Sequence, residues 1–259
     1  MSELHPVIFV GAGPGDPELI TVKGQKALLR AELVLYAGSL VPPAALEWAG
    51  ADAELVDTAT LNLEEIIEKI RAGHRAGKRV VRVHSGDPSL YGAIQEQLEA
   101  LEREQIPCEV IPGVTAAFAA AAALAQELTL PEVTQTVILT RAAGRTPVPP
   151  GEALQDLARH RATLAVYLSI GLIDRVVAEL TPAYGPDTPV VVAYRVSWPE
   201  QLLLRGTLST IAGKVKEWGI ERQALILVGP ALAAREGELK ARSKLYDESF
   251  SHGFRGGDQ

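Results

Sequence analysis

The feature that most constrains the fold is a glycine-rich turn near the start of the chain, residues 11–17 (GAGPGDP). It follows the apolar run at residues 7–10 (VIFV) and precedes a helical pattern over about residues 18–30. A strand, a glycine-rich turn and a helix N-terminus in this order allow the backbone to approach a ligand closely. The sequence therefore predicts an α/β fold with a candidate ligand site at the end of the first strand.

This turn, which we call turn 1, departs from the dinucleotide-binding pattern GxGxxG, because Asp16 stands where the last glycine belongs. Three glycines, two prolines and a carboxylate suit a sharp, rigid turn better than a loop that holds a pyrophosphate. We expect Asp16 to cap the following helix, with Pro17 at its first position. On this stretch alone, the alternative is a stiff connection that binds no ligand.

Composition bounds the class of protein. At 259 residues with 47% hydrophobic residues, the chain can form one large domain or two smaller ones around a sizeable core. The net charge of -7 disfavours a nucleic-acid partner and requires local arginine or lysine for any acidic substrate. The single cysteine, Cys108, excludes an internal disulfide and a cysteine-rich metal site. No secretory signal precedes Val7 and no apolar window reaches the roughly 20 residues of a membrane span, so we expect a soluble, cytoplasmic protein.

The first half of the chain alternates short strand-like and helix-like segments. Apolar strands separated by helices indicate a parallel sheet covered on both faces, whose ligands bind beyond the carboxyl ends of the strands. We expect strands at residues 7–10, 33–36, 54–57, 79–83 and 109–111, and helices at about residues 18–30, 43–49, 63–76 and 89–104.

Two further turns resemble turn 1. Turn 2, residues 84–92 (HSGDPSLYG), follows the fourth strand and repeats the pattern GDPxL of residues 15–19. Turn 3, residues 111–115 (IPGVT), precedes an alanine-rich helix expected at residues 116–125. Because each turn follows a strand and begins a helix, we expect all three at one edge of the sheet. The residues expected nearest a ligand are Pro14, Gly86, Asp87 and Thr115.

From about residue 129 the strand candidates become longer and more β-branched, which indicates a second domain. No helix pattern interrupts residues 189–208, and SWPE at residues 197–200 is typical of a hairpin turn. The sheet of this second domain is therefore expected to be mixed. We divide the chain into an N-terminal α/β domain (1–128), a C-terminal α/β domain (129–235) and a charged tail (236–259). Strands are expected at 136–140, 163–168, 189–194, 201–208 and 224–228, and helices at about 152–159, 171–180 and 209–218.

A basic loop, residues 140–147 (TRAAGRTP), places Arg141 and Arg145 beside small residues. Such a loop can hold carboxylates through paired hydrogen bonds. From charge alone, a solvated surface loop is the favoured alternative. Likewise, the carboxylate of Asp87 could serve only as a helix cap.

Several motifs of other enzyme classes do not occur in the sequence. It has no GxxxxGK(S/T), no HExxH or paired CxxC, and no GxSxG, which disfavours P-loop nucleotidases, zinc enzymes and serine hydrolases. No metal-ligand set is predicted. The histidines are scattered, and only His84 falls near a candidate turn, where a structural or solvated role is favoured.

Together, the three turns resemble those of the tetrapyrrole methyltransferases, which use S-adenosylmethionine; the match covers residues 7 to about 230. Residues 140–147 look like the mark of one branch, which methylates C11 of precorrin-4 or cobalt-precorrin-4 to give precorrin-5 in cobalamin synthesis. The resemblance implies two α/β domains with an active-site cleft between them, usually in a homodimer. It also implies an acidic tetrapyrrole substrate and no metal for methyl transfer.

The resemblance implies a set of binding residues, position by position. Relatives that methylate uroporphyrinogen often carry methionine where this chain has Leu168, which puts that substrate branch in doubt. Val196 lies in a poorly matched loop. The implied substrate contacts are Arg141, Arg145, Asp16 and Tyr91. The implied cofactor contacts are Pro14, Ser85, Gly86, Asp87, Leu90, Thr115, Ala116, Leu168, Val196, Ala224 and Leu225.

The sequence leaves alternatives in two classes. Within the family, the acceptor could be another precorrin carbon or uroporphyrinogen III. In a different class, the chain could be a nucleotide-binding module without catalytic activity. No residue is identified as a catalytic base.

Overall fold

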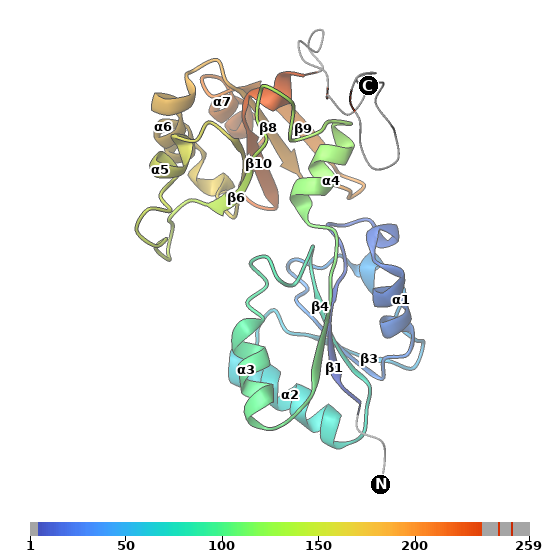
Figure 1. Cartoon of the computed structure of the whole chain (residues 1–259). Helices are drawn as coiled ribbons and strands as arrows, with labels where there is room; N and C mark the ends of the chain where they lie inside the picture. Colours follow the sequence, from blue (N-terminus) through green and yellow to red (C-terminus); the bar gives the residue numbers. More distant parts are fainter. Residues whose placement is uncertain (1–4, 235–242, 244–249, 251–259) are drawn as a thin grey trace. The chain divides into compact units, whose positions relative to one another are not determined.

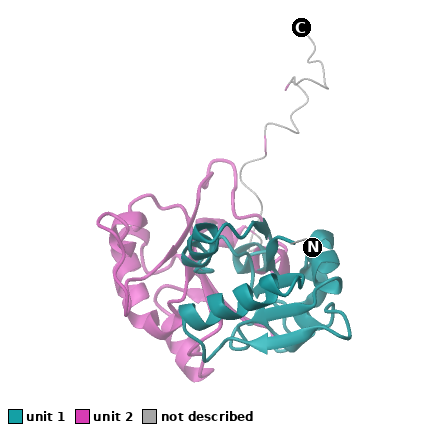
Figure 2. Cartoon of the chain, turned by 90° about the horizontal axis from the view of Figure 1, so that it is seen from below, with its two compact units in different colours: residues 1–119, 195–200 teal, residues 120–194, 201–259 magenta. Residues whose placement is uncertain are grey.

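The computed structural model describes residues 5–234 together with Ser243 and Phe250. The chain forms two compact units (Figure 2): residues 1–119 with 195–200, and residues 120–194 with 201–259. Apart from those two residues, the expected charged tail lies outside the described part of the chain. Among the described residues, no helix has the length and apolar character needed to span a membrane.

The N-terminal unit is built on a parallel sheet, as the sequence predicted (Figure 1). All of its neighbouring strands pair in parallel, in the order β3-β2-β4-β1-β5. Val10 of the interior strand β1 is in register with Val83 and Ile111, so the carboxyl ends of β1, β4 and β5 lie side by side. The strands are β1 (Val7–Gly11), β2 (Leu33–Tyr36), β3 (Glu54–Asp57), β4 (Val80–His84) and β5 (Cys108–Ile111).

Helices cover both faces of this sheet. On one face Phe9 and Leu35 pack with Ile70 and Leu101 from two helices; on the other, residues such as Val10 pack with the first helix. Neighbouring residues of a strand point into two different cores, so both faces of the strand are buried. The strands are therefore continuous apolar runs in the sequence. The helices are α1 (Val22–Leu29), α2 (Leu63–Arg75) and α3 (Gln95–Arg103), with 3-10 helices η1 (Pro17–Leu19) and η2 (Pro43–Leu46).

The helix predicted after turn 1 is interrupted. Asp16 caps the short η1 by accepting a hydrogen bond from the Glu18 backbone N–H, with Pro17 at the first position as expected. Ile20 is then extended, and the Thr21 hydroxyl caps a new helix, α1. The segment predicted as a helix over residues 43–49 is likewise the 3-10 helix η2.

The helix predicted directly after turn 2 is wrong for residues 89–94, because α3 begins only at Gln95. Tyr91 and Ala93 have φ of 56° and 47°, which a right-handed helix does not admit. Turn 2 therefore continues into a loop, and its Gly-Asp-Pro sequence does not begin a helix.

The C-terminal unit is built on a mixed sheet, also as predicted. In the order β6-β7-β10-β8-β9, only β6 and β7 pair in parallel, and β8 and β9 form the expected hairpin. The strands are β6 (Val137–Arg141), β7 (Thr163–Tyr167), β8 (Pro189–Tyr194), β9 (Leu202–Thr207) and β10 (Ala224–Val228).

One core of the C-terminal unit lies where helices pack on this sheet. Leu164, Val192 and Ile226 from three strands meet Leu154, Leu180 and Ile211 from three helices there. The helical segments are α5 (Leu154–Ala158), η3 (Ile170–Leu172), α6 (Ile173–Tyr184), α7 (Ile211–Glu217) and η4 (Pro230–Ala233). The alanine-rich helix α4 (Ala116–Ala123) begins in the N-terminal unit and ends in the C-terminal unit.

Candidate functional site

The three glycine-rich turns meet at the carboxyl edge of the N-terminal sheet. Gly86 donates its N–H to the carbonyl of Gly13 at 2.7 Å, and Gly13 donates back at 3.3 Å. Gly113 donates its N–H to the Asp87 carboxylate at 2.9 Å. Turn 1 is thus bonded to turn 2, and turn 2 to turn 3, as expected from their positions after parallel strands.

Glycine is required where the turns approach one another. A Cβ on Gly113 would lie 2.1 Å from the Gly86 carbonyl oxygen, and one on Gly11 would lie 2.6 Å from the Gly113 nitrogen. Gly86 itself has φ of +65°, a conformation that favours glycine. The backbones of the three turns are therefore in direct contact at these positions.

Asp87 ties two of the turns together. One carboxylate oxygen accepts from the Ser89 N–H at 2.8 Å and the other from the Gly113 N–H at 2.9 Å. The first contact is an Asx turn, in which the side chain mimics a backbone turn. The structure thus gives Asp87 a role in joining turns 2 and 3, where the sequence offered a helix cap.

The other predicted residues of the N-terminal unit surround this junction. Pro14 and Thr115 are buried, and Ser85, Gly86 and Leu90 are half-buried. Beyond them, Tyr91 is 43% exposed in the loop that precedes α3.

The loop between β8 and β9, residues 195–200, contacts turn 1 directly. The Trp198 indole N–H donates to the Pro14 carbonyl at 2.8 Å, and the Ser197 hydroxyl accepts from the Asp16 N–H at 2.9 Å. A Cβ on Gly15 would lie 2.1 Å from the indole, so only glycine admits it in this position. The sequence predicted the hairpin turn but not this contact, for which the only signal was a tryptophan within a hairpin loop.

Charge and strain also mark the β8–β9 loop. The Arg195 guanidinium lies 5.2 Å from the centre of the Trp198 ring, in a cation–π arrangement, and 3.7 Å from the Glu200 carboxylate. Arg195 and Ser197 have φ of 42° and 67°, which side-chain-bearing residues rarely adopt. Val196, an expected cofactor contact, is only 5% exposed within this loop.

A second group of predicted residues gathers at one edge of the C-terminal sheet. Because Ile226 is in register with Val166 in antiparallel strands, Ala224 and Leu225 lie beside the carboxyl end of β7. Leu168 follows that end, with a side chain 71% exposed and φ of 55°. An exposed, strained leucine is unusual, and such strain concentrates at functional sites.

The two arginines of the basic loop differ in their partners. Arg141 donates to the carbonyls of Thr146 at 3.1 Å and Pro147 at 2.6 Å, so it shapes its own loop. Arg145 is exposed and forms no ion pair with any residue that the structure describes. Of the pair, Arg145 has the guanidinium that is available to an acidic ligand.

Two basic side chains that the sequence interpretation did not assign to the site lie buried on β4. Burial lowers the pKa of Arg82 to about 10. Burial, and then the nearby charge of Arg82, lower the pKa of His84 to about 3, so its imidazole is neutral at pH 7. The His84 ring stacks on the Phe9 ring, with 5.9 Å between the ring centres. The signal for Arg82 was an arginine within the apolar run at residues 79–83 (RVVRV).

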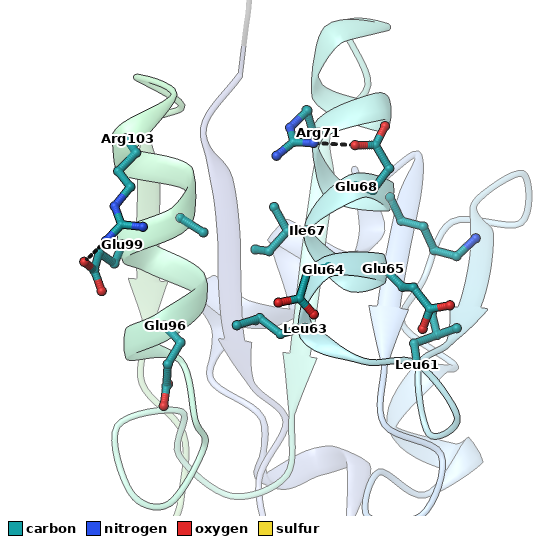
Figure 3. A pocket seen from close by; sticks show the side chains of 12 residues that line it. Leu61, Leu63, Glu64, Glu65, Ile67, Glu68, Arg71, Glu96, Glu99 and Arg103 are labelled. Carbon is teal, nitrogen blue, oxygen red and sulfur yellow. Dashed lines mark hydrogen bonds and ion pairs between the residues drawn. The ribbon is translucent and has the colours of Figure 1, made fainter.

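A groove between α2 and α3 is separate from all these residues (Figure 3). Two pairs of its charged side chains form ion pairs within the groove, Arg71 with Glu68 and Arg103 with Glu99. No predicted site residue lines it. In the described part of the chain, no group of three or more histidine, cysteine or acidic side chains is arranged to hold a metal ion.

Comparison with known proteins identifies the family. Residues 6–212 match the family of tetrapyrrole (corrin/porphyrin) methylases. The precorrin-4 C(11)-methyltransferase of Pseudomonas aeruginosa is 55% identical over 252 residues, which cover 97% of this chain and 99% of that protein.

Solved structures agree with this assignment. A cobalt-precorrin-4 methyltransferase superposes with a TM-score of 0.86 at 50% identity, covering 88% of this chain and 95% of that one. A uroporphyrin-III C-methyltransferase from Thermus thermophilus, solved in complex with S-adenosylhomocysteine, gives a TM-score of 0.73 at 30% identity, covering 88% and 99%. The chain belongs to the tetrapyrrole (corrin/porphyrin) methylases.

Proposed function

We propose that this chain transfers a methyl group from S-adenosylmethionine to C11 of precorrin-4 or cobalt-precorrin-4, giving the corresponding precorrin-5 in cobalamin biosynthesis. The observation that carries this proposal is the 55% identity, over nearly the whole length of both chains, to a precorrin-4 C(11)-methyltransferase. Identity to the uroporphyrin-III enzyme is lower, at 30%. A different acceptor carbon within the family is therefore the second candidate.

The junction of turns offers features that fit S-adenosylmethionine. A Cβ placed on Gly86 would meet nothing closer than the Thr115 Cα at 3.8 Å, so its outer side has room for a ligand. The exposed Leu168 provides an apolar surface that can pack against an adenosine. The proposed cofactor contacts are Pro14, Ser85, Gly86, Asp87, Leu90, Thr115, Ala116, Leu168, Val196, Ala224 and Leu225.

The chemistry requires positioning above all. When bound, S-adenosylmethionine supplies a methyl group that its sulfonium already makes electrophilic. The chain has to hold that group in line with the acceptor carbon, and such orientation contributes up to about 7–11 kcal/mol in the best intramolecular cases. The hydrogen bonds of Gly13 with Gly86, and of Gly113 with the Asp87 carboxylate, suit this task, because they keep the proposed cofactor-binding turns from shifting.

Basic side chains at the site must bind the carboxylates of the acidic macrocycle, since the whole chain carries a net charge of -7. We propose Arg145 as the principal carboxylate contact because its guanidinium has no ion-pair partner among the described residues. Arg141 would contribute mainly by shaping the loop that carries Arg145. Asp16 and Tyr91 complete the proposed substrate contacts. The Asp16 carboxylate can accept hydrogen bonds from pyrrole N–H groups, and Tyr91 offers a phenol.

Assembly and location are part of the proposal. The family resemblance supports a homodimer, and the biosynthetic role of the relatives supports a cytoplasmic enzyme. Analytical ultracentrifugation tests the first: a protein that sediments as a monomer at micromolar concentration would contradict it.

A labelled-methyl experiment tests the reaction. The protein is incubated with carbon-13 methyl-labelled S-adenosylmethionine and precorrin-4, with and without cobalt, and the label is located by NMR. We expect it at C11; a label at another carbon would contradict the assignment. Calorimetry with S-adenosylhomocysteine and with NAD is the control, because binding of NAD alone would favour a nucleotide-binding module.

The arginine assignment has its own test. Arg145→Ala is expected to raise the KM for the macrocycle at least tenfold, since a hydrogen bond to a charged group contributes about 1.5–3 kcal/mol. The Kd for S-adenosylhomocysteine should stay unchanged. Arg175→Ala is the matched control, because Arg175 donates to the Ala143 carbonyl of the same loop. Equal losses of macrocycle and cofactor binding in Arg145→Ala would contradict its role.

A further inference from the structure

Arg82 and His84 are buried basic side chains with unsatisfied polar atoms. Arg82 is 5% exposed and His84 is 8% exposed, and neither the Arg82 Nε nor the His84 Nε2 has a hydrogen-bond partner. A guanidinium has five N–H donors. The structure gives Arg82 one acceptor, the Thr58 hydroxyl at 3.0 Å from Nη1. Most of the hydrogen-bonding capacity of this arginine is therefore unused.

Arg82 also lacks a counter-charge. No carboxylate in the described part of the chain forms an ion pair with it, and burial alone accounts for the lowering of its pKa. A buried charge without a partner is strongly destabilising, so buried arginines are normally paired. The missing partner is then an anion that does not belong to the described chain.

The guanidinium lies at the carboxyl edge of the sheet, although the Arg82 Cα is in the middle of β4. Arg82 is in register with Phe9 and Leu35, but its side chain reaches Thr58, which directly follows the carboxyl end of β3. His84 lies two residues further along β4, on the same face as Arg82, and directly precedes turn 2. His84 thus adjoins the junction of turns, and the Arg82 guanidinium lies at the same carboxyl edge of the sheet, on the side of β3.

We infer that Arg82 and His84 form a carboxylate-binding subsite that receives one acetate or propionate side chain of the macrocycle. This inference rests on the proposed function, because it names a second contact for the same substrate. The planar guanidinium suits paired hydrogen bonds to a carboxylate, and the His84 Nε2 can donate a further one. Phe9, stacked on His84, holds the imidazole in place.

Substitution of Arg82 separates this subsite from a structural role. Arg82→Met is expected to raise the KM for the macrocycle at least tenfold, to leave the Kd for S-adenosylhomocysteine unchanged, and to keep or raise Tm, because it removes an unpaired buried charge. Arg82→Lys is expected to restore only part of the affinity, because an ammonium cannot form the paired bonds. Arg79→Met is the matched control, since Arg79 is exposed, pairs with Glu32 and directly precedes β4, away from the carboxyl edge of the sheet.

An unchanged macrocycle KM in Arg82→Met would overturn the inference. A larger loss of Tm in Arg82→Met than in Arg79→Met would also overturn it. Such a loss would show that Arg82 supports the fold, with internal water as its hydrogen-bond partner.

A measurement on the unaltered protein avoids the risk of misfolding. The pKa of His84 is followed by NMR on nitrogen-15 histidine-labelled protein, free and in the dead-end complex of precorrin-4 with S-adenosylhomocysteine. The subsite predicts a rise on binding, because a carboxylate favours the charged imidazolium; an unchanged pKa would refute it. If the labelled-methyl experiment places the label at C11 and the pKa of His84 does not move, the inference alone fails. If no methyl is transferred to precorrin-4, the proposed function fails.

Discussion

Residues 15–17 and residues 86–88 carry the same tripeptide, Gly-Asp-Pro, after the neighbouring strands β1 and β4. In both, the aspartate accepts a hydrogen bond from the N–H two residues on: Asp16 from Glu18 at 2.9 Å and Asp87 from Ser89 at 2.8 Å. The first then begins the 3-10 helix η1, whereas the second continues into a loop. The local geometry is shared, and the structures that follow differ.

The two aspartates also differ in what holds them. Asp87 uses its second oxygen to bind the Gly113 N–H of turn 3, so its carboxylate joins two turns. Turn 1 is held through its backbone, by Trp198 and Ser197 of the β8–β9 loop. The same tripeptide thus acts as a side-chain connector in one place and as a backbone contact surface in the other. Tertiary partners, which no local pattern contains, decide between these roles.

Gly113→Ala is expected to give the largest effect, because the new Cβ would lie 2.1 Å from the Gly86 carbonyl oxygen. Backbone cannot move aside without separating turns 2 and 3, so we expect a loss of about 3 kcal/mol of unfolding free energy, at the upper end for overpacking. Urea denaturation measures it, and calorimetry should show weakened binding of S-adenosylhomocysteine.

Gly15→Ala is the matched control for that experiment. Its Cβ would lie equally close, at 2.1 Å, but to the Trp198 side chain. An indole can rotate away, so the loss of stability should be smaller than in Gly113→Ala. Equal losses would mean that the β8–β9 loop is as immobile as the backbone of turn 2.

Asp87→Ala is expected to rank next. It removes two hydrogen bonds to a carboxylate, one of which links turn 2 to turn 3. Hydrogen bonds to charged groups contribute about 1.5–3 kcal/mol each, and partial exposure places the total near 2–3 kcal/mol. Asp87→Asn, which keeps one acceptor oxygen, should recover part of the loss in the same urea measurement. If Asp87→Ala costs no more than Asp16→Ala, the connection between turns 2 and 3 does not matter for stability.

Trp198→Phe tests the outside support of turn 1. It keeps an aromatic ring but removes the N–H that binds the Pro14 carbonyl, which should cost about 1 kcal/mol. Because Pro14 is a proposed cofactor contact, we expect the KM for S-adenosylmethionine to rise several-fold while kcat changes little. Trp218→Phe is the control, since that tryptophan is 60% exposed at the C-cap of α7. Equal KM values for the two variants would contradict a positioning role for Trp198.

The difference between the two tripeptides also shows which parts of the fold could be predicted from the sequence. Apolar runs such as residues 7–10 predicted the strands correctly. A strand that is buried on both faces is a short, continuous run of apolar residues, and few other elements share this pattern. The prediction of a helix at residues 89–94 was wrong, because Tyr91 and Ala93 have positive φ, which helix propensity does not predict.

The candidate site divides in the same way. The meeting of turns 1, 2 and 3 follows from parallel strands, so it could be predicted. The contact of Trp198 with Pro14 joins residues far apart in the chain, and no spacing rule encodes it. The only signal for the burial of Arg82 was its place within an apolar run, and the usual exposure of arginine outweighed it.

Asp16→Ala is expected to have the smallest effect. The Asp16 carboxylate makes one cap hydrogen bond, to the Glu18 N–H of a short helix at the surface, and caps of this kind contribute about 0.5–1 kcal/mol. The backbone N–H that binds Ser197 is unaffected by the substitution, so the β8–β9 loop should stay in place. Urea denaturation and tryptophan fluorescence together measure both outcomes. A loss as large as that of Asp87→Ala, or a shift in the fluorescence of Trp198, would show that the side chain of Asp16 holds turn 1, and would remove the contrast between the two tripeptides.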